Sequence, residues 1–246
     1  MGMARRALLL LLVLALAGCA AAQRRAPDPR DPLEPINRAV FSFNDGFDRH
    51  FMRPVARGYK AITPDPVEQG VRNFFANLGD VRNLLNDLLQ LKPTEALDDF
   101  GRLTINSTFG LLGVFDIATD VGLERNDEDF GQTLGYWGVP DGPYLVLPIL
   151  GPSSLRDAPS LYVDYRTSPQ TYAVHRQWLS NTLWALNFTS VRAELLGVSA
   201  VLDDVAFDRY ESLRDAWFER RAFQVSDGAS AKSQDEELMD ELDQLD

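Results

Sequence analysis

The sequence is poor in the residues that most often build catalytic and metal centres. Its 246 residues include one cysteine and two histidines, His50 and His175, which stand far apart in the chain. Neither histidine lies in an HExxH motif or in a Cys/His spacing typical of zinc sites. The hydrolase elbow GxSxG, the phosphate loop GxxxxGK[ST] and the dinucleotide motif GxGxxG do not occur either. We therefore expect no metal, no cofactor and no catalytic activity, and a phospholipase in particular lacks its nucleophile and base.

Basic residues are also scarce. The chain carries 24 lysines and arginines against 36 acidic residues, a net charge of −12. No basic patch interrupts this excess, so we expect no nucleic-acid partner. Much of the acidity is local, because residues 226–246 hold eight acidic residues and a single base, Lys232.

Long apolar runs are missing as well. No stretch holds 18 uninterrupted apolar residues, so no conventional transmembrane helix is predicted. The longest run, the 11 residues Ala7 to Ala17, follows Arg5 and Arg6 and precedes Gly18, the layout of an export signal. As a helix it would span roughly 17 Å, against about 30 Å of hydrocarbon, which is too short for a permanent membrane span.

The single cysteine, Cys19, directly follows this run. A lone cysteine in an exported chain has no internal disulfide partner. Leu16, Ala17, Gly18 and Cys19 resemble a bacterial lipobox, which implies a diacylglyceryl group on the thiol, cleavage before Cys19 and acylation of the new amino terminus. The alternative is an ordinary cleavage site beside a chance cysteine. Several acyl chains give stable anchoring, and Ala20 lacks the aspartate that resembles an inner-membrane retention signal, which favours the outer membrane.

The rest of the chain divides by composition and periodicity. Residues 1–18 are the predicted signal peptide, 19–35 a lipidated tether, 36–225 a helical domain and 226–246 an acidic tail. Apolar residues recur at steps of three and four in several segments, which is typical of amphipathic helices. These segments are 36–51, which Pro54 ends; 71–91; one that begins from Thr94 as N-cap; 178–196; and 205–223. The best strand pattern, PYLVLPILG (143–151), is interrupted by Pro148, so the sequence predicts an all-α fold.

Two apolar stretches rich in glycine do not fit a plain helical bundle. They are TFGLLGVFDIATDVGL (108–123) and GQTLGYWGVPDGPYLVLPILGPSSLRD (131–157). Composition alone favours buried, irregular core segments. The alternative is a re-entrant hairpin and rim at a membrane surface, where irregular backbone is tolerated only beside protein or a water-filled cavity.

An acidic segment, ERNDEDFG (124–131), connects the two stretches. Its carboxylates, Glu124, Asp127, Glu128 and Asp129, are of the type that binds Ca²⁺, but they lack the regular ligand spacing of an EF-hand. We interpret the segment as a solvated acidic loop.

Five segments, in order, resemble one family. They are DPLEPINRAVFSFNDGFDRHFMRPVARGY (31–59), NFFANLGDVRNLLNDLLQLKP (73–93), FGRLTINSTFGLLGVFDIATDVGL (100–123), DFGQTLGYWGVPDGPYLVLPILGPSSLRD (129–157) and DRYESLRDAWFERRAF (208–223). All are similar to the MlaA (VacJ) outer-membrane lipoproteins. The similarity is dense from residue 31 to about 165 and returns at 208–223, whereas 166–207 resembles the family loosely.

The resemblance implies an all-α, ring-like single domain of amphipathic helices. Such a domain lies in the inner leaflet of the outer membrane and has a Gly-rich hairpin and a central hydrophilic channel. It implies association with a trimeric porin and transfer of misplaced outer-leaflet phospholipid to a periplasmic carrier protein, which preserves lipid asymmetry. The covalent acyl groups on Cys19 would be its only attached groups. A structural lipoprotein that braces a porin without moving lipid is the alternative.

The resemblance also implies candidate residues beside the lipid passage. They are Phe43, Asn44, Gly110, Leu111, Leu112, Gly113, Asp116, Gly131, Gly135 and Arg156. Some of them have a structural alternative. Gly110 and Gly113 suit turn geometry, Phe43 suits core packing, and Arg156 suits an ion pair with Asp157.

Three further features qualify the resemblance. Leu91 stands where the family is associated with glycine, and Arg209 where it is associated with proline. In the tail, Leu238, Leu242 and Leu245 follow a helical spacing among acids, which allows a short amphipathic helix that docks on a basic surface of the carrier. We favour the alternative, a disordered acidic extension.

Overall fold

The computed structural model describes residues 28–228, apart from the side chains of residues 204 and 205. Residues 28–32 belong to a separate N-terminal unit, in which Arg30 pairs with Asp28 at 2.7 Å. The second unit begins at Leu33 and contains every helix and strand of the described part. The predicted signal peptide, Cys19 and the tail from residue 229 lie outside the described residues.

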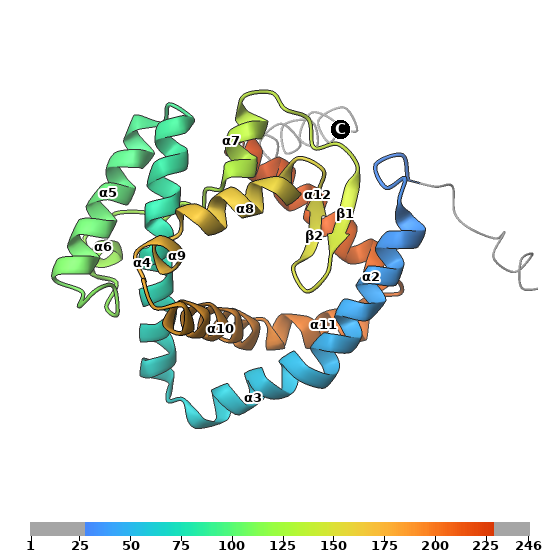
Figure 1. Cartoon of the computed structure of the whole chain (residues 1–246), viewed down its shortest axis with the longest axis horizontal. Coiled ribbons are helices and arrows are strands. Elements are labelled where there is room, and N and C mark those ends of the chain that lie inside the picture. The colour runs from blue at the N-terminus through green and yellow to red at the C-terminus, as the bar shows by residue number, and fades with distance from the viewer. Residues whose placement is uncertain (1–27, 229–246) are drawn as a thin grey trace, which may run out of the picture. The chain divides into compact units, whose positions relative to one another are not determined.

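Helices and a single two-stranded sheet make up the described part of the second unit (Figure 1). In chain order they are α2 (Glu34–Phe47), the π-helix η1 (Asp48–Met52), α3 (Arg53–Ile62), α4 (Asp65–Leu89), α5 (Pro93–Thr108), α6 (Ile117–Asp120), α7 (Phe130–Tyr136), β1 (Tyr144–Leu147), β2 (Gly151–Ser154), α8 (Asp157–Thr167), α9 (Pro169–Tyr172), α10 (Gln177–Glu194), α11 (Leu196–Val205) and α12 (Arg209–Val225). The all-α prediction is confirmed, since the sheet is a short antiparallel hairpin.

Contacts between these elements form a closed circuit within the second unit. Helix α2 packs on β1 and runs through η1 into α3, which packs on α10. Helix α10 packs on α4, α4 on α7, and α7 on α8, which returns to the hairpin at β2. Figure 1 shows α4 and α5 side by side and the hairpin close to α2. Segments far apart in the chain therefore share one interior.

Polar side chains fill most of that interior. The long helix α4 buries its polar face, which carries Asn77, Asp80, Asn83, Asn86 and Asp87. Three leucines near its C-terminal end, Leu85, Leu88 and Leu89, lie on the outer surface and are 41–57% exposed. An amphipathic helix of a water-soluble bundle has the opposite orientation, so α4 presents an apolar surface to its surroundings.

Buried carboxyl groups require either a partner or a proton. Asp99 of α5 is fully buried against α4. Burial, together with the neighbouring Asp87 and Asp80 carboxyls, raises the pKa of Asp99 to about 9. Asp99 is therefore neutral at pH 7 and its carboxyl proton serves as a hydrogen-bond donor to Asp87.

A small apolar core lies where α2, β1 and α12 meet. Tyr144 of β1 packs its ring 5.5 Å from the rings of both Trp217 and Phe218. Two asparagines of α2, seven residues apart, fasten the hairpin to this core. Asn37 donates to the Tyr144 carbonyl and accepts from the Val146 amide, both at 2.9 Å. Because each asparagine offers a donor and an acceptor, it completes the strand edge as another strand would.

The second of these asparagines is the predicted site residue Asn44. Its side chain donates to the Leu147 carbonyl at 2.9 Å and accepts from the Ile149 amide at 2.8 Å. Asn44 thus holds the turn of the β-hairpin against α2.

Several predicted helix boundaries were wrong. Pro54 does not end the first helical path, because η1 continues directly into α3 and Pro54 lies in the first turn of α3. Thr94 is not an N-cap, since α5 begins at Pro93 and no side chain caps it. The expected segment 205–223 is divided, and α12 begins at Arg209 after the N-cap Asp208. Arg209 therefore holds a first-turn position, which also suits proline.

The connection between α4 and α5 explains the glycine expected at position 91. The Leu91 amide donates to the Leu88 carbonyl and the Lys92 amide to the Asp87 carbonyl, which is the Schellman arrangement of a helix C-terminus. It requires a left-handed residue, and Leu91 has φ = 60°. Leucine is strained in this conformation by roughly 1–2 kcal/mol, whereas glycine is not.

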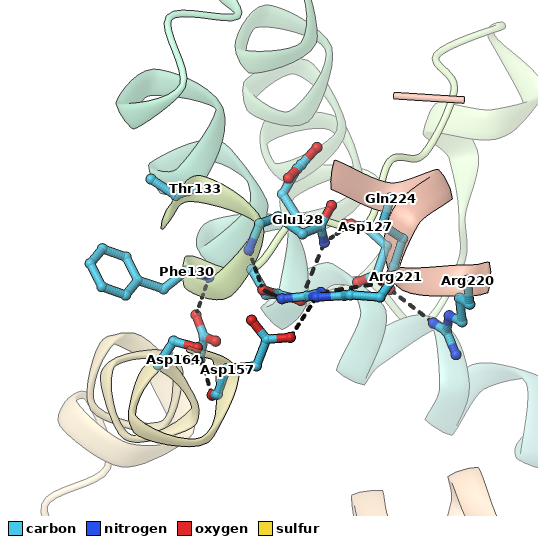
Figure 2. A network of polar contacts seen from close by, with 12 residues as sticks. Asp127, Glu128, Phe130, Thr133, Asp157, Asp164, Arg220, Arg221 and Gln224 are labelled. Atoms are coloured by element: carbon cyan, nitrogen blue, oxygen red, sulfur yellow. Dashed lines mark hydrogen bonds and ion pairs between the residues drawn. The ribbon is translucent and has the colours of Figure 1, made fainter. Parts of the chain in front are cut away.

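Charged residues join α7, α8 and α12 (Figure 2). Arg221 of α12 grips both carboxylate oxygens of Asp129 at 2.6 and 2.7 Å, and its Nε lies 2.7 Å from Asp157. Burial disfavours the Asp129 carboxylate, but the Arg221 hydrogen bonds outweigh it and lower the pKa of Asp129 to about 2. This network closes the junction of the three helices.

The acidic segment 124–131 is part of this junction. Glu128 is buried and accepts from Gln90 at 2.7 Å and from Lys92 at 3.0 Å. Asp127 pairs with Arg82 at 2.8 Å. The interpretation as a solvated acidic loop was therefore wrong for Glu128, which is buried beside Lys92. It is confirmed for Asp127, whose side chain is 60% exposed.

Asp164 of α8 is the exception in the network. It accepts a hydrogen bond from the Phe130 amide at 3.1 Å (Figure 2) and forms no ion pair with a basic residue of the described chain. Burial, together with the nearby Asp129 charge, raises the pKa of Asp164 to about 6.

Leu91→Gly is expected to raise the free energy of unfolding by about 1 kcal/mol, because it removes left-handed strain at a side chain that is 69% exposed. Leu85→Gly, inside α4, is the matched control and should lower it by a similar amount or more. Chemical unfolding of the detergent-solubilised protein measures both. Equal losses in the two variants would contradict the strain at Leu91.

Asp164→Asn is expected to stabilise the protein more at pH 8 than at pH 4. The raised pKa means that the folded state binds the proton more tightly, so wild-type stability falls as the pH rises from about 4 to about 6. Asparagine keeps the acceptor for the Phe130 amide and does not titrate, so the variant does not lose this stability as the pH rises. Relative to the wild type, its free energy of unfolding at pH 8 should increase by up to about 3 kcal/mol.

Unfolding midpoints at the two pH values measure the effect. Glu219→Gln is the matched control, because it removes a negative charge from an exposed position on α12. The change in stability that it causes should depend little on pH. A gain for Asp164→Asn of the same size at both pH values would refute the titration of Asp164.

Candidate functional site

A polar cavity of about 710 Å³ lies between α4, the segment after α6, and α9 and α10. Most of its walls are amide and charged side chains. The walls include Arg72, Asn73, Asp80, Arg125, Asn187 and Glu194. Charges of both signs therefore face one hydrated space, in which a zwitterionic group finds partners for both of its charges.

One wall of the cavity depends on Asp116. Its carboxylate accepts from Arg102 at 2.9 and 3.0 Å, from Asn106 at 2.9 Å and from the Thr119 hydroxyl at 2.8 Å. Burial raises the pKa of Asp116, but its hydrogen-bond donors and the Arg102 charge outweigh that effect and lower the pKa to about 2. Asp116 is ionised at every physiological pH and fixes α6 against α5.

Asp80 and Arg125 are more loosely matched. Arg125 lies 3.8 Å from Asp80 and 3.7 Å from Asp116, distances of ion pairs without hydrogen bonds. Both carboxylate oxygens of Asp80 are buried without a hydrogen-bond donor in the described residues, and burial raises the pKa of this group. Arg125 is about one-third exposed, so its guanidinium is available to an anionic group in the cavity.

The turn before Asp116 is strained. Leu111, Leu112 and Gly113 adopt successive left-handed conformations with φ of 52°, 59° and 89°. Asn77 of α4 pins the turn by donating to the Leu112 carbonyl at 3.3 Å. A Cβ at Gly110 would lie 2.6 Å from the Asn106 carbonyl oxygen. Gly110 and Gly113 are therefore required by turn geometry, and strain of this kind is typical of functional segments.

The two leucines of this turn point outward, each about two-thirds exposed. Phe109 and Phe115 beside them are 70% and 57% exposed. The expectation from composition, that 108–123 is buried core, was therefore wrong. The turn is an apolar projection anchored by polar side chains beneath it.

An apolar pocket of about 660 Å³ adjoins the polar cavity. Val67, Phe74, Val114 and Ile117 contribute to its walls, with Leu186 from α10. It shares the wall residues Gln69, Asn73, Phe75 and Asp116 with the polar cavity. A polar space and an apolar space therefore lie on opposite sides of a common wall.

The predicted site residues are not brought to one place. Asp116 lines both cavities, and Gly110 to Gly113 form the turn beside it. Phe43 is 58% exposed on α2, so it does not pack in a core.

Gly131, Gly135 and Arg156 lie at the α7–α8–α12 junction. Arg156 is buried and pairs with Asp141 at 2.5 Å and Asp157 at 2.7 Å. Cβ atoms at Gly131 and Gly135 would collide with Arg221 and Arg156. The ion pair expected between Arg156 and Asp157 is confirmed, and the two glycines make room for guanidinium groups.

The polar residues of α4 were not among the predicted site residues. Asn73, Asn77, Asp80, Asn83 and Asp87 recur at steps of three and four along one face. The signal was present in the sequence, as a stripe of amides and carboxyls at helical spacing. It was overlooked because the apolar stripe on the opposite face predicted the same helix.

Within residues 28–228, no single helix combines the length and the apolar composition needed to cross a bilayer. Helix α10 and the segment Leu196–Asp203 meet both criteria only together, as a pair bent by 49°.

Comparison with known proteins places these features in a family. The family model described as MlaA lipoprotein matches residues 29–224. The intermembrane phospholipid transport system lipoprotein MlaA of Escherichia coli is 32% identical, with 94% of each chain covered. The protein of the same name from Haemophilus influenzae is also 32% identical, over 95% of this chain and 96% of its own. An uncharacterized protein of Rickettsia prowazekii is 36% identical over 79% and 78% of the two chains.

A solved structure from work described as "Structural basis for maintenance of bacterial outer membrane lipid asymmetry" superposes with a TM-score of 0.70 at 33% identity. The match covers 79% of this chain and 98% of that one. Because both the family match and the superposition extend over most of the described helices, the chain belongs to the MlaA lipoprotein family.

Proposed function

We propose that this protein is the outer-membrane lipoprotein of an intermembrane phospholipid transport system. It removes mislocalised phospholipids from the outer leaflet through a polar channel and delivers them to a periplasmic carrier protein, which maintains lipid asymmetry. The observation that carries the proposal is the inverted packing of α4, whose polar face lines a polar cavity and whose leucines at positions 85, 88 and 89 face outward. The named relatives of the chain belong to such a system.

The physical task of the channel is to carry a charged head group past hydrocarbon. A phosphodiester or an ammonium group in hydrocarbon is strongly disfavoured. The polar cavity offers Arg72 and Arg125 to the phosphate and Glu194 to a cationic head group. The adjoining apolar pocket provides a surface for acyl chains. Transfer then requires a path and no bond chemistry, in agreement with a protein that is not an enzyme.

The location and partners follow from the same proposal. Acyl groups on Cys19 hold the chain in the inner leaflet of the outer membrane, and the outward-facing leucines of α4 and of the 109–116 turn lie among lipid tails. The ring-like domain sits beside a trimeric porin, which stabilises it in the membrane. The channel opens toward the periplasm, where the carrier accepts the lipid.

A purely structural lipoprotein is less well supported. A protein that only supports a porin needs an outward apolar surface and a membrane anchor, and a transport protein has both of these features as well. A purely structural protein has no need of a 710 Å³ polar cavity with loosely paired charges, since burying such groups lowers stability. The cavity therefore favours transport.

Gly79→Phe should block transport without unfolding the protein. Gly79 lines the polar cavity, and a Cβ there meets no atom within 4 Å, so the ring would enter the cavity. Gly110 is unsuitable because a side chain there collides with its own turn. Outer-leaflet phospholipid is measured in cells that lack the protein and carry each variant.

The matched control is Gly46→Phe on α2, where a Cβ also meets nothing within 4 Å and which lines neither cavity. We expect Gly46→Phe to restore asymmetry and Gly79→Phe to lose most of this activity at equal abundance. Full restoration by Gly79→Phe would remove the support for a channel through this cavity.

Cys19→Ala tests the anchor separately. If the thiol carries the lipid, surface phospholipid should stay raised in cells that express only this variant, and the protein should leave the membrane fraction. If asymmetry never depends on the protein while the envelope becomes mechanically fragile without it, the structural role replaces transport.

A further inference from the structure

A second, smaller pocket of about 180 Å³ lies where α3 meets the end of α10 and α11. Its polar walls are Arg53, Arg57, Arg192, Ser199 and Asp203. It shares no wall residue with the polar cavity or the apolar pocket. Three arginines thus converge on a space outside the proposed lipid passage.

Two of these arginines are held rigidly. Arg53 donates through Nε to Asp48 at 2.7 Å and through Nη1 to Asp203 at 2.6 Å. Arg192 grips Asp48 through Nε and Nη2 at 2.5 and 2.9 Å. Burial disfavours the Asp48 carboxylate, but these hydrogen bonds outweigh it and lower its pKa. The guanidinium groups are therefore fixed in place before any ligand arrives.

Each of the two arginines also has an unused donor. Arg53 Nη2 and Arg192 Nη1 are buried and have no hydrogen-bond acceptor among the residues described. Burying a donor without an acceptor is costly, and such groups in folded proteins usually have a partner. Arg53 and Arg192 therefore keep hydrogen-bonding capacity that Asp48 and Asp203 do not use.

Arg57 completes the set. It lies one helical turn after Arg53, so both project from the same face of α3. Arg57 is exposed and makes no hydrogen bond or ion pair within the described part of the chain. With three arginines facing Asp48 and Asp203, the pocket keeps a net positive charge.

We propose that this pocket binds a phosphate group. Guanidinium forks match the oxygens of phosphate, and several together favour it over a single carboxylate. The volume corresponds to about six water molecules at roughly 30 Å³ each, which suits one hydrated phosphate group and is too small for a whole lipid.

The phosphate has two chemical sources. Val198 and Val201 on α11 are 63% and 64% exposed, and Ile62 on α3 is 83% exposed. An arginine pocket beside such apolar side chains suits the phosphate of an anionic lipid at a membrane interface. A free phosphate ion offers the same oxygens to the pocket.

The test uses the full chain in maltoside micelles and follows the thermal unfolding midpoint. One arm titrates inorganic phosphate against chloride at equal ionic strength. The second arm compares micelles doped with phosphatidylglycerol against micelles doped with diacylglycerol, which has the same chains and no phosphate. A ligand that binds the folded state raises the midpoint with its concentration, from which an apparent Kd follows.

Arg57→Gln is the main variant because Arg57 supports no described contact of its own. The matched control is Arg166→Gln, an exposed arginine on α8 that lies outside the pocket walls. We expect Arg57→Gln to weaken phosphate-dependent stabilisation at least fivefold and Arg166→Gln to leave it unchanged. Ala200→Phe, which fills the pocket and keeps every charge, should weaken it as strongly.

The part of the stabilisation that Arg57→Gln and Ala200→Phe remove belongs to this pocket. If only the phosphatidylglycerol effect contains such a part, the ligand is a lipid phosphate, and if both probes do, the pocket binds phosphate in general. No stabilisation of the wild-type chain by either probe overturns the proposal. Equal weakening by Arg57→Gln and Arg166→Gln, or full binding by Ala200→Phe, also overturns it. Arg57 and Ala200 line neither the polar cavity nor the apolar pocket, so the part of the stabilisation that their variants remove is independent of the Gly79 experiment.

Discussion

A carboxylate inside a protein is stable only when a cation, several hydrogen-bond donors or a proton compensates its charge. The packing of this chain depends on meeting that condition repeatedly. Arg102 and Asn106 satisfy Asp116, and Arg221 satisfies Asp129. A retained proton neutralises Asp99. Each compensated group holds two helices together. In a water-soluble protein, contacts between apolar side chains usually have this role.

This polar interior leaves the apolar side chains on the outside. The leucines of α4 and of the strained 109–116 turn become outer surface, while amides and charges line the 710 Å³ cavity. The same inversion therefore produces a domain suited to a lipid environment and a polar cavity within it. In the proposed function, the outer surface meets acyl chains and the cavity accommodates head groups. The loosely paired Asp80 and Arg125 fit this role, because a fully paired wall would offer nothing to a passing phosphate.

Much of the molecule could be predicted from the sequence, because the decisive signals were local. Helical periodicity located α10 to within two residues and most of α4 and α12, although α4 begins six residues before the predicted start and α12 four residues after it. Pro148 follows the end of β1, as its missing donor requires. The glycine expected at position 91 and the proline expected at 209 both have local geometric causes, a left-handed C-terminus and a helix first turn. The order of five family motifs identified the family, and Cys19 remains a prediction as the anchor.

Only the tertiary structure decided which face of each helix is buried. Periodicity shows that two faces differ, but it does not show which one faces the interior, because that depends on the surrounding solvent and on partners distant in the chain. The acidic segment 124–131 is an example: Glu128 and Asp129 were expected to be solvated, but Lys92 and Arg221 lie beside them in the fold. Cavities arise in the same way, from side chains on α4 and α10 that lie far apart in the chain. Sequence by itself determined the family, most of the helices and the expected anchor, whereas long-range packing determined the polar interior, the two cavities and the arginine pocket.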